Sequence, residues 1–121
     1  MKTLTTAEEE IMQHLWTLEE ASVAQVIEEM PEPKPAYNTV STIVRILENK
    51  GFVDYRKQGR GHIYFPLISK QEYSSATAKK FAANYFKGSY KSMVSFFMKQ
   101  EDLSVQDLED LLEEIDKNKK S

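Results

Sequence analysis

The hydrophobic periodicity of the chain changes at Gly51, and this change limits the fold more than any other feature. Before Gly51, apolar residues recur at the i, i+3, i+4 spacing of amphipathic helices. Three such helices are predicted, at about residues 6–18, 22–30 and 36–50. After Gly51, two strand-like runs at 52–57 and 62–67 flank a Gln-Gly-Arg-Gly sequence. The order of helix, helix, helix and hairpin predicts a mainly α-helical domain that carries one small β-hairpin.

Capping boxes mark the predicted starts of the helices. In such a box, a Ser or Thr and a Glu or Gln three residues later each accept a hydrogen bond from the other's backbone N–H. The pairs are Thr5 with Glu8, Ser22 with Gln25, and Ser69 with Glu72, and Ser104 is expected to cap a last helix. Pro31 ends the second helix, and its alternation with Pro33 and Pro35 predicts a stiff, extended connector.

The chain after residue 68 is predicted to be helical and rich in large apolar side chains. The stripe expected to be buried within it is Ala78, Phe81, Ala82 and Tyr85. A segment of this size has too little core to hide so many apolar groups alone, so a second copy of the chain is expected to cover them. The residues assigned to this dimerisation surface are Tyr90, Met93, Phe97, Leu108, Leu111 and Leu112. The prediction is a first domain at 1–68 and a helical dimerisation domain at 69–121.

The charge is unevenly distributed, although the 121 residues together have a net charge of only −3. Residues 3–33 contain eight acidic residues and no Lys or Arg, whereas residues 45–60 contain five basic residues and two acidic ones. Binding to a polyanion depends on the field at the contact, so an acidic average does not exclude a basic face that binds nucleic acid. A scattered, solvated surface is the alternative explanation of these charges.

The composition argues against an enzyme, a metal site and a cofactor. The chain has no Cys and only two imidazoles, His14 and His62, neither of which lies in a catalytic pattern. Phosphate-binding glycine loops and zinc-protease motifs are absent from the sequence. The acidic last helix is expected to present a solvated face, and a hydrolase with a weak cation site there is the less favoured alternative.

The sequence contains no segment that is expected to enter a membrane. No uninterrupted apolar run approaches the roughly 20 residues that span a bilayer. The first ten residues are acidic where a secretory signal is basic and then apolar. A cytoplasmic protein is therefore expected.

The polar face of the third predicted helix differs from an ordinary solvated face. At about 100° per residue, one arc holds Asn38, Ser41, Thr42 and Arg45, with Thr39 at its border. Short side chains allow a helix to approach another surface closely. They suit the DNA major groove, where Arg recognises guanine, Asn recognises adenine and a Thr methyl group touches the thymine methyl. Capping of the helix start explains Asn38 and Thr39 equally well, but it does not explain residues one turn later.

The predicted hairpin adds basic residues beside this helix. Arg56, Lys57 and Arg60 flank or occupy its glycine-rich tip, where they are expected to reach DNA phosphates or the minor groove. Solvated basic residues in a turn are the alternative for each of the three alone. The helix and the hairpin together favour DNA binding.

A set of short motifs extends over nearly the whole chain. They are Leu4-Thr5, Ala7-Glu8, Ile11-Met12, Leu15-Trp16, Thr39-Val40, Thr42, Arg45, Leu47, Lys50-Gly51, Gly59-Arg60, Tyr64, Tyr85-Phe86-Lys87-Gly88, Met93-Val94 and Glu101-Asp102-Leu103-Ser104. In these motifs the chain resembles the BlaI/MecI/CopY family of winged-helix repressors, the penicillinase and methicillin-resistance repressors. The resemblance implies a winged helix-turn-helix followed by a C-terminal helical dimerisation element, with Thr39, Thr42 and Arg45 facing DNA.

Two departures from that family affect how the DNA would be released. The copper-responsive members carry C-terminal cysteines that bind metal, and this chain has none, so copper control is not implied. The members that respond to β-lactams are inactivated by proteolysis between an Asn and a Phe, and the matching position here is Phe96-Phe97. The resemblance therefore implies a regulatory protease as a partner only if that protease accepts Phe96 in place of the asparagine.

The sequence predicts a sequence-specific DNA-binding transcriptional repressor that acts as a homodimer on a dyad-symmetric, double-stranded operator. The alternative is a winged-helix module for protein–protein interaction without specific DNA binding, which the acidic first two helices favour. Salt-dependent affinity for DNA distinguishes the two functions, because only a phosphate-contacting protein releases counterions on binding.

Overall fold

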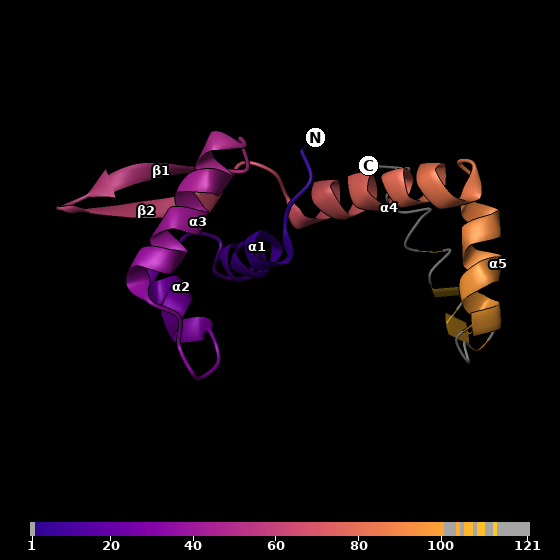
Figure 1. The fold of residues 1–121 in the computed structure, drawn as a ribbon, viewed down its shortest axis with the longest axis horizontal. Coiled ribbons are helices and arrows are strands. Elements are labelled where there is room, and N and C mark those ends of the chain that lie inside the picture. The colour runs from indigo at the N-terminus through magenta and orange to yellow at the C-terminus, as the bar shows by residue number, and fades with distance from the viewer. Residues whose placement is uncertain (1, 101–103, 105, 108, 111–112, 114–121) are drawn as a thin grey trace. The chain divides into compact units, whose positions relative to one another are not determined.

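The computed structural model describes residues 2–100, 104, 106, 107, 109, 110 and 113. Its elements in chain order are α1 (Thr6–Leu18), α2 (Val23–Glu29), α3 (Tyr37–Asn49), β1 (Val53–Gln58), β2 (Gly61–Pro66), α4 (Lys70–Phe86) and α5 (Tyr90–Gln100) (Figure 1). The described residues after 104 are helical as well. The predicted class, mainly α with one small hairpin, is confirmed, and the predicted bounds of α1 are those observed.

The chain divides into two compact units, Met1–Ala76 and Thr77–Ser121. The division falls inside α4, and each unit is described by itself. Division into compact units does not show that either part folds independently. The domains at 1–68 and 69–121 therefore stay a prediction. Of the expected dimerisation residues, Leu108, Leu111 and Leu112 lie outside the described part of the chain.

Reciprocal hydrogen bonds are present at all of the predicted caps. At the start of α1, the Glu8 N–H donates to the Thr5 Oγ1 over 3.2 Å, and the Thr5 N–H donates to the Glu8 Oε1 over 2.9 Å. The same pattern joins Ser22 to Gln25, Ser69 to Glu72, and Ser104 to Asp107. These caps satisfy backbone donors that the first turn of a helix leaves without partners.

The segment between α2 and α3 bends, so the predicted extended connector is wrong. The bend lies at Glu32 and Pro33, whose peptide bond is cis. The bend is stabilised by Lys34, whose Nζ reaches back to the end of α2. It donates hydrogen bonds to the carbonyl oxygens of Ile27, Glu28 and Met30 over 3.1, 3.1 and 2.8 Å. A cation at the C-terminal end of a helix also interacts favourably with the helix dipole, and the bend brings it there.

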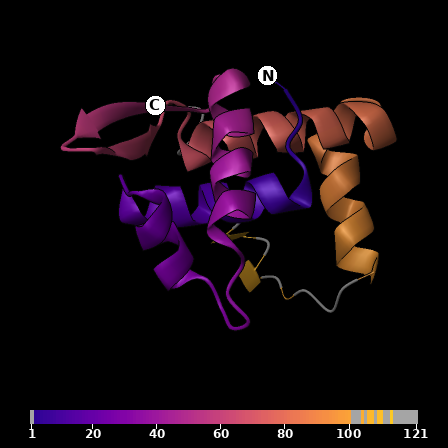
Figure 2. The same cartoon turned by 60° about the vertical axis from the view of Figure 1, so that its left-hand side comes forward.

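The core of the first unit lies where α1, α2, α3 and the hairpin meet. Its largest fully buried side chains are Ile11, Met12, Leu15, Val26, Val40, Val44, Leu47, Phe52 and Val53. Figure 2 shows α3 crossing α1, and both α1 and α2 contact α3. Burial of these apolar side chains is the main force that holds α3 in place.

The two strands of the hairpin pair with each other, and the hairpin also forms backbone hydrogen bonds to the helical part. β1 and β2 pair antiparallel, and a two-residue turn at Gly59 and Arg60 joins them, with Gly59 at a φ of 61°. The backbone of β2 also bonds Ala21, in the turn after α1, through two N–H···O bonds between Ala21 and Tyr64 of 2.9 and 2.8 Å. The base of the hairpin therefore cannot move without breaking contacts to the helical part.

Candidate nucleic-acid interface

One side of α3 is buried and the opposite side is exposed. Val40, Val44 and Leu47 are each at most 1% exposed and hold the helix against the core. On the other side, the exposed residues from the sequence-predicted site are Asn38, Thr39, Thr42 and Arg45. Ser41 is half-buried at the margin, because it lies about 60° from Asn38 toward the buried side at 100° per residue. The structure thus presents four of the five predicted residues on one exposed face.

The hydroxyl group of Thr42 is engaged within the helix. Its Oγ1 donates a hydrogen bond to the carbonyl oxygen of Asn38 over 2.8 Å. Bonding of this kind between residues i and i−4 is common for Thr in helices. The hydroxyl hydrogen is therefore not available for a base, whereas the γ-methyl group remains as an apolar contact.

Arg45 lies next to the hairpin and supplies positive charge to the exposed face. Among the described residues, the salt bridges are Lys50–Glu8 and Arg56–Glu20, so Arg45 is not neutralised by an acidic partner there. It does act on the buried Tyr64 of β2. Burial and the negative charge of Glu48 raise the pKa of Tyr64 above 10.0, and the positive charge of Arg45 opposes that shift. The charge of Arg45 therefore acts on β2 as well as on the exposed face of α3.

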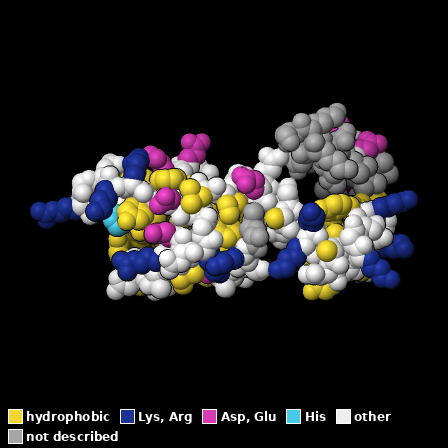
Figure 3. Space-filling model, turned by 90° about the horizontal axis from the view of Figure 1, so that it is seen from above, with side chains coloured by type: hydrophobic (Ala, Val, Ile, Leu, Met, Phe, Trp, Pro, Cys, Tyr) yellow, Lys and Arg dark blue, Asp and Glu magenta, His cyan; other side chains and the backbone are white. Residues whose placement is uncertain are grey.

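The three basic residues of the hairpin do not share one face. Arg56 and Lys57 are consecutive on β1, so their side chains point to opposite faces of the sheet. Lys57 pairs across the hairpin with His62 and shares its face with Tyr64, which packs on the helical core near α3. Arg60 is exposed in the turn itself. Figure 3 shows dark-blue basic side chains around the outer end of the hairpin.

Arg56 has an acidic partner, which the sequence analysis did not foresee. Its Nη2 lies 2.6 Å from the Glu20 Oε1, and the two side chains are 46% and 51% exposed. A pair this exposed is worth only about 0–1 kcal/mol. The interaction directs Arg56 toward the turn between α1 and α2, but it is weak enough to be exchanged for a phosphate.

Two exposed residues of α3 were missed by the sequence analysis. Tyr37 is 59% exposed in the first turn, and Ile46 is 39% exposed between the directions of Thr39 and Thr42. Only polar residues were sought on the exposed arc. The same 100° rotation places Ile46 on that arc, so the signal was present in the sequence.

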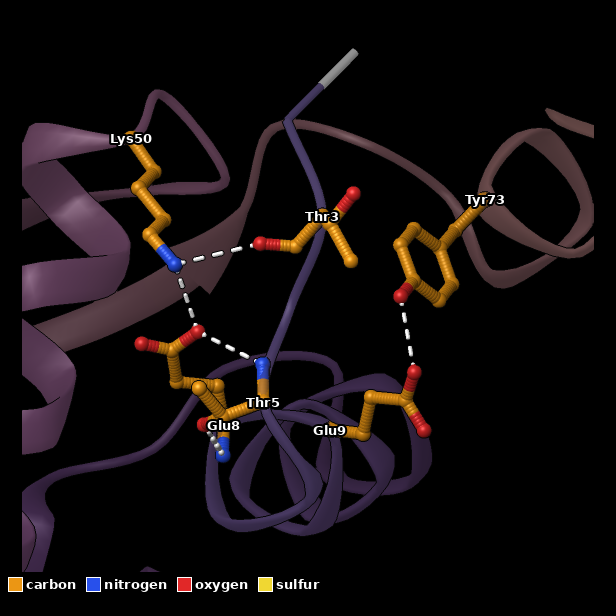
Figure 4. Close-up of polar contacts among 6 residues, drawn as sticks. All are labelled: Thr3, Thr5, Glu8, Glu9, Lys50 and Tyr73. Carbon is orange, nitrogen blue, oxygen red and sulfur yellow. Dashed lines mark hydrogen bonds and ion pairs between the residues drawn. The ribbon is translucent and has the colours of Figure 1, made fainter. Parts of the chain in front are cut away.

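A partly buried ion pair holds the end of α3 to the start of α1 (Figure 4). The Lys50 Nζ donates to the Glu8 Oε1 over 2.7 Å and to the Thr3 carbonyl over 3.2 Å. Burial alone raises the pKa of Glu8, but hydrogen bonds from Lys50 and Thr5, with the charge of Lys50, outweigh burial and lower that pKa below 4.5. Nearby, the Tyr73 hydroxyl donates to the Glu9 Oε1 over 2.8 Å. The Lys50 contacts hold the end of α3 to the start of α1, and the Tyr73 contact joins α4 to α1.

The second unit exposes aromatic side chains where the dimerisation surface was predicted. Tyr90 and Phe97 are exposed and Met93 is half-buried. Further exposed aromatic residues are Phe81, Tyr85 and Phe96. Of the stripe expected to be buried, only Ala82 is buried in the single chain, and Tyr85 is 71% exposed. The expectation of a buried Tyr85 is therefore wrong for one copy of the chain, because α5 leaves that part of α4 uncovered.

Metal ligands and membrane spans were also sought in the part of the chain that the structure describes. No group of three or more His, Asp or Glu side chains gathers there in a way that suits a metal ion. None of the described helices combines the length and apolar character needed to cross a bilayer.

Three helices followed by a hairpin that bonds back to the turn after α1 define a winged-helix protein. The comparison with known families then places it more narrowly. The chain belongs to the penicillinase repressor family, whose model matches residues 4–117. The predicted family resemblance is confirmed, and the family is one of transcriptional repressors, which is not a class of enzyme.

Characterised relatives match over most of the chain. The methicillin resistance regulatory protein MecI of Staphylococcus aureus (strain N315) is 32% identical over 109 residues, which are 89% of this chain and 89% of MecI. The penicillinase repressor of Bacillus licheniformis is 26% identical over 117 residues, which are 96% of this chain and 91% of that protein.

Two solved structures resemble the chain over its N-terminal part. The solution structure of the DNA binding domain of the repressor BlaI has a TM-score of 0.50 and 28% identity, and the match covers 58% of this chain and 90% of that one. The monomeric form of Bacillus licheniformis BlaI in complex with the blaP half-operator has a TM-score of 0.50 and 27% identity, covering 60% of this chain and 89% of that one. The winged-helix fold class is confirmed.

Proposed function

We propose that the chain is a sequence-specific DNA-binding transcriptional repressor that acts in the cytoplasm, as a homodimer, on a dyad-symmetric operator. The observation that carries this proposal is the exposed face of α3, on which Asn38, Thr39, Thr42 and Arg45 stand together. A helix of this shape fits the major groove, and its short side chains let the backbone come close to the bases. The BlaI complex with a half-operator supports the same use of this fold.

Each residue has a role that follows from its chemistry. Arg45 is assigned to guanine, where a guanidinium makes two hydrogen bonds, and Asn38 to adenine. Thr39 and Ser41 flank these contacts at the two margins of the face. On the hairpin, Lys57 and Arg60 are assigned to phosphates, which position the protein without reading the sequence. Arg56 joins them if its ion pair with Glu20 is exchanged for a phosphate.

The homodimer rests on the second unit. Tyr90, Met93 and Phe97 carry apolar surface that one chain leaves exposed or half-exposed, and an isologous contact with a second copy would cover it. Two copies would present two α3 helices to two half-sites about one turn of DNA, or a small multiple of one turn, apart. A regulatory protease that separates the copies is a further partner only if it accepts Phe96 in place of the family's asparagine, with Phe96-Phe97 on α5 as the matching bond.

The test begins with genomic DNA fragments retained by the purified protein, which are sequenced to obtain the operator. Operator affinity is then measured for Arg45→Ala and for Gln13→Ala, a matched exposed substitution on α1. Arg45→Ala is expected to weaken specific binding by about 1–3 kcal/mol at unchanged thermal stability, and Gln13→Ala is expected to bind as the parent does. A parent protein without any salt-dependent affinity for DNA would instead favour the protein-interaction module.

A further inference from the structure

Ile46 is an apolar side chain on the face of α3 that the proposed function assigns to DNA. It is 39% exposed and is not part of the core, although its neighbours Val44 and Leu47 are buried there. At seven residues after Thr39 and four after Thr42, it lies on the same side of the helix as both. Ile46 therefore adds an apolar group to the exposed face near its border, between the directions of Thr39 and Thr42.

The three residues form a line of methyl groups, which we call the methyl line: Thr39, Thr42 and Ile46. Thr42 contributes its γ-methyl group because its hydroxyl is bonded to the Asn38 carbonyl over 2.8 Å. The hydrogen-bonding residues Asn38 and Arg45 lie on the other side of the arc, about 40–120° around the helix from the members of the line. The exposed face of α3 is therefore divided lengthwise into a polar half and an apolar half.

The DNA major groove has one apolar group that matches such a line. Base edges there are donors and acceptors, with the exception of the 5-methyl group of thymine. Thr39 and Ile46 are seven residues apart, which is about 10 Å along the helix axis at 1.5 Å per residue. This length corresponds to about three base-pair steps at 3.4 Å each, so the line can meet more than one thymine.

We propose that the methyl line reads thymine methyl groups in the operator, with Ile46 as a specificity-determining residue. The inference rests on the proposed function and deepens it. Ile46 and Thr42 bury their methyl groups against thymine, while Arg45 and Asn38 read the polar edges of adjacent base pairs. The half-site therefore contains at least one thymine whose methyl group, and not only its base pairing, is required for full affinity.

The experiment replaces each thymine of the half-site by deoxyuracil, which removes one methyl group and keeps the base pair. The parent protein, Ile46→Ala, Ile46→Val and Thr42→Ser are each titrated with the whole set of duplexes. The parent is expected to bind about fourfold more weakly at one or two substituted positions, the equivalent of burying one methyl group. Ile46→Ala is expected to lose a similar factor on the unmodified operator and to be insensitive to deoxyuracil at the same position.

The two remaining variants are a control for tolerance of change at position 46 and a test of the Thr42 methyl group. Ile46→Val retains a branched apolar side chain and is expected to keep the sensitivity to deoxyuracil, and its melting temperature checks that position 46 tolerates change. Thr42→Ser keeps the hydroxyl and removes the methyl, so it is expected to lose sensitivity at a neighbouring thymine. Specific binding by the parent with no effect of deoxyuracil, or with the same effect in Ile46→Ala, overturns this inference alone. Absence of specific binding by the parent overturns the proposed function as well.

Discussion

Lys50 at the end of α3 and Glu8 in the first turn of α1 form a partly buried ion pair, with 2.7 Å between Nζ and Oε1. The Glu8 side chain is only 6% exposed, and its Oε1 also accepts the N–H of Thr5. One carboxylate therefore caps one helix and anchors another. Because α3 carries the exposed face assigned to DNA, this pair links the stability of the fold to the placement of that face.

Removal of the Glu8 charge is the first prediction. Glu8→Gln is expected to lower the free energy of unfolding by about 1–3 kcal/mol, because Lys50 loses its charged partner in a largely buried position. Urea unfolding at pH 7 measures the change. Glu10→Gln is the control, since Glu10 is exposed in the same helix turn. An equal loss in both variants would show that general helix electrostatics, and not the ion pair, explains the effect.

The pH dependence of stability is the second prediction. The pKa of Glu8 is lower in the folded state than its ordinary value of 4.5. The unfolded chain therefore binds the proton more readily, and the stabilisation is complete above pH 4.5 and is lost as the pH falls through the folded pKa. Thermal unfolding of the parent and of Glu8→Gln between pH 3 and pH 7 is expected to show curves that converge at the acid end. Parallel curves would mean that Glu8 does not titrate in this window.

The hairpin residues give the third prediction, which concerns the salt dependence of DNA binding. Lys57→Ala and Arg60→Ala are each expected to reduce the slope of log K against log salt by roughly one unit for every phosphate that a subunit no longer neutralises. Arg56→Ala is expected to change the slope less, because Glu20 already neutralises Arg56 in the free protein.

Glu20→Gln is the matched variant for this third prediction. It releases Arg56 from its ion pair and is expected to raise the affinity for specific and random DNA alike. If Arg56→Ala lowers the slope as much as Lys57→Ala does, Arg56 abandons Glu20 on binding and contacts a phosphate directly.

The fourth prediction concerns assembly. Phe97→Asp introduces a charge into the apolar surface of α5 and is expected to separate the dimer, at a cost of several kcal/mol for an unpaired buried charge. Operator affinity then falls sharply because the two half-sites are no longer bound together. Ser95→Asp is the control, since Ser95 is exposed and lies between Lys91 and Lys99 at helical spacing.

Sedimentation and operator titration give the result for both variants of α5. The melting transition of the first unit checks that the winged helix is still folded in Phe97→Asp. A Phe97→Asp protein that remains dimeric, or a monomer that binds as tightly as the parent, would remove Phe97 from the interface.

Much of the first unit follows from local sequence patterns. The bounds of α1 were predictable because the box of Thr5 and Glu8 fixes one end of the helix and the apolar spacing defines the rest. The hairpin bounds were one residue off, since Phe52 is buried beneath α3 and does not enter β1. Alternation of apolar and polar residues and the helical period are properties of a single strand or helix. The elements that they define were therefore predicted well.

The contacts that the sequence did not reveal join residues far apart in the chain. Lys50 and Glu8 are 42 positions apart, and Arg56 and Glu20 are 36 apart. No pattern within one element indicates such a partner, and a glutamate at a helix start is already explained by the helix dipole. The bend after α2 was missed for a different reason, because the three prolines alone were considered and the contacts of the Lys34 side chain with the end of α2 were not.

Lys34 is exposed as a residue, yet its ammonium nitrogen donates hydrogen bonds to three carbonyl oxygens at the end of α2. A lysine attacks an acylating reagent only after its nitrogen gives up a proton and turns a lone pair outward. For Lys34 this requires the helix end to lose its bracing contacts first, whereas Lys91 stands on the outer surface of α5. The rate at which an amine reagent labels Lys34 therefore reports how often its ammonium group leaves these three carbonyl oxygens.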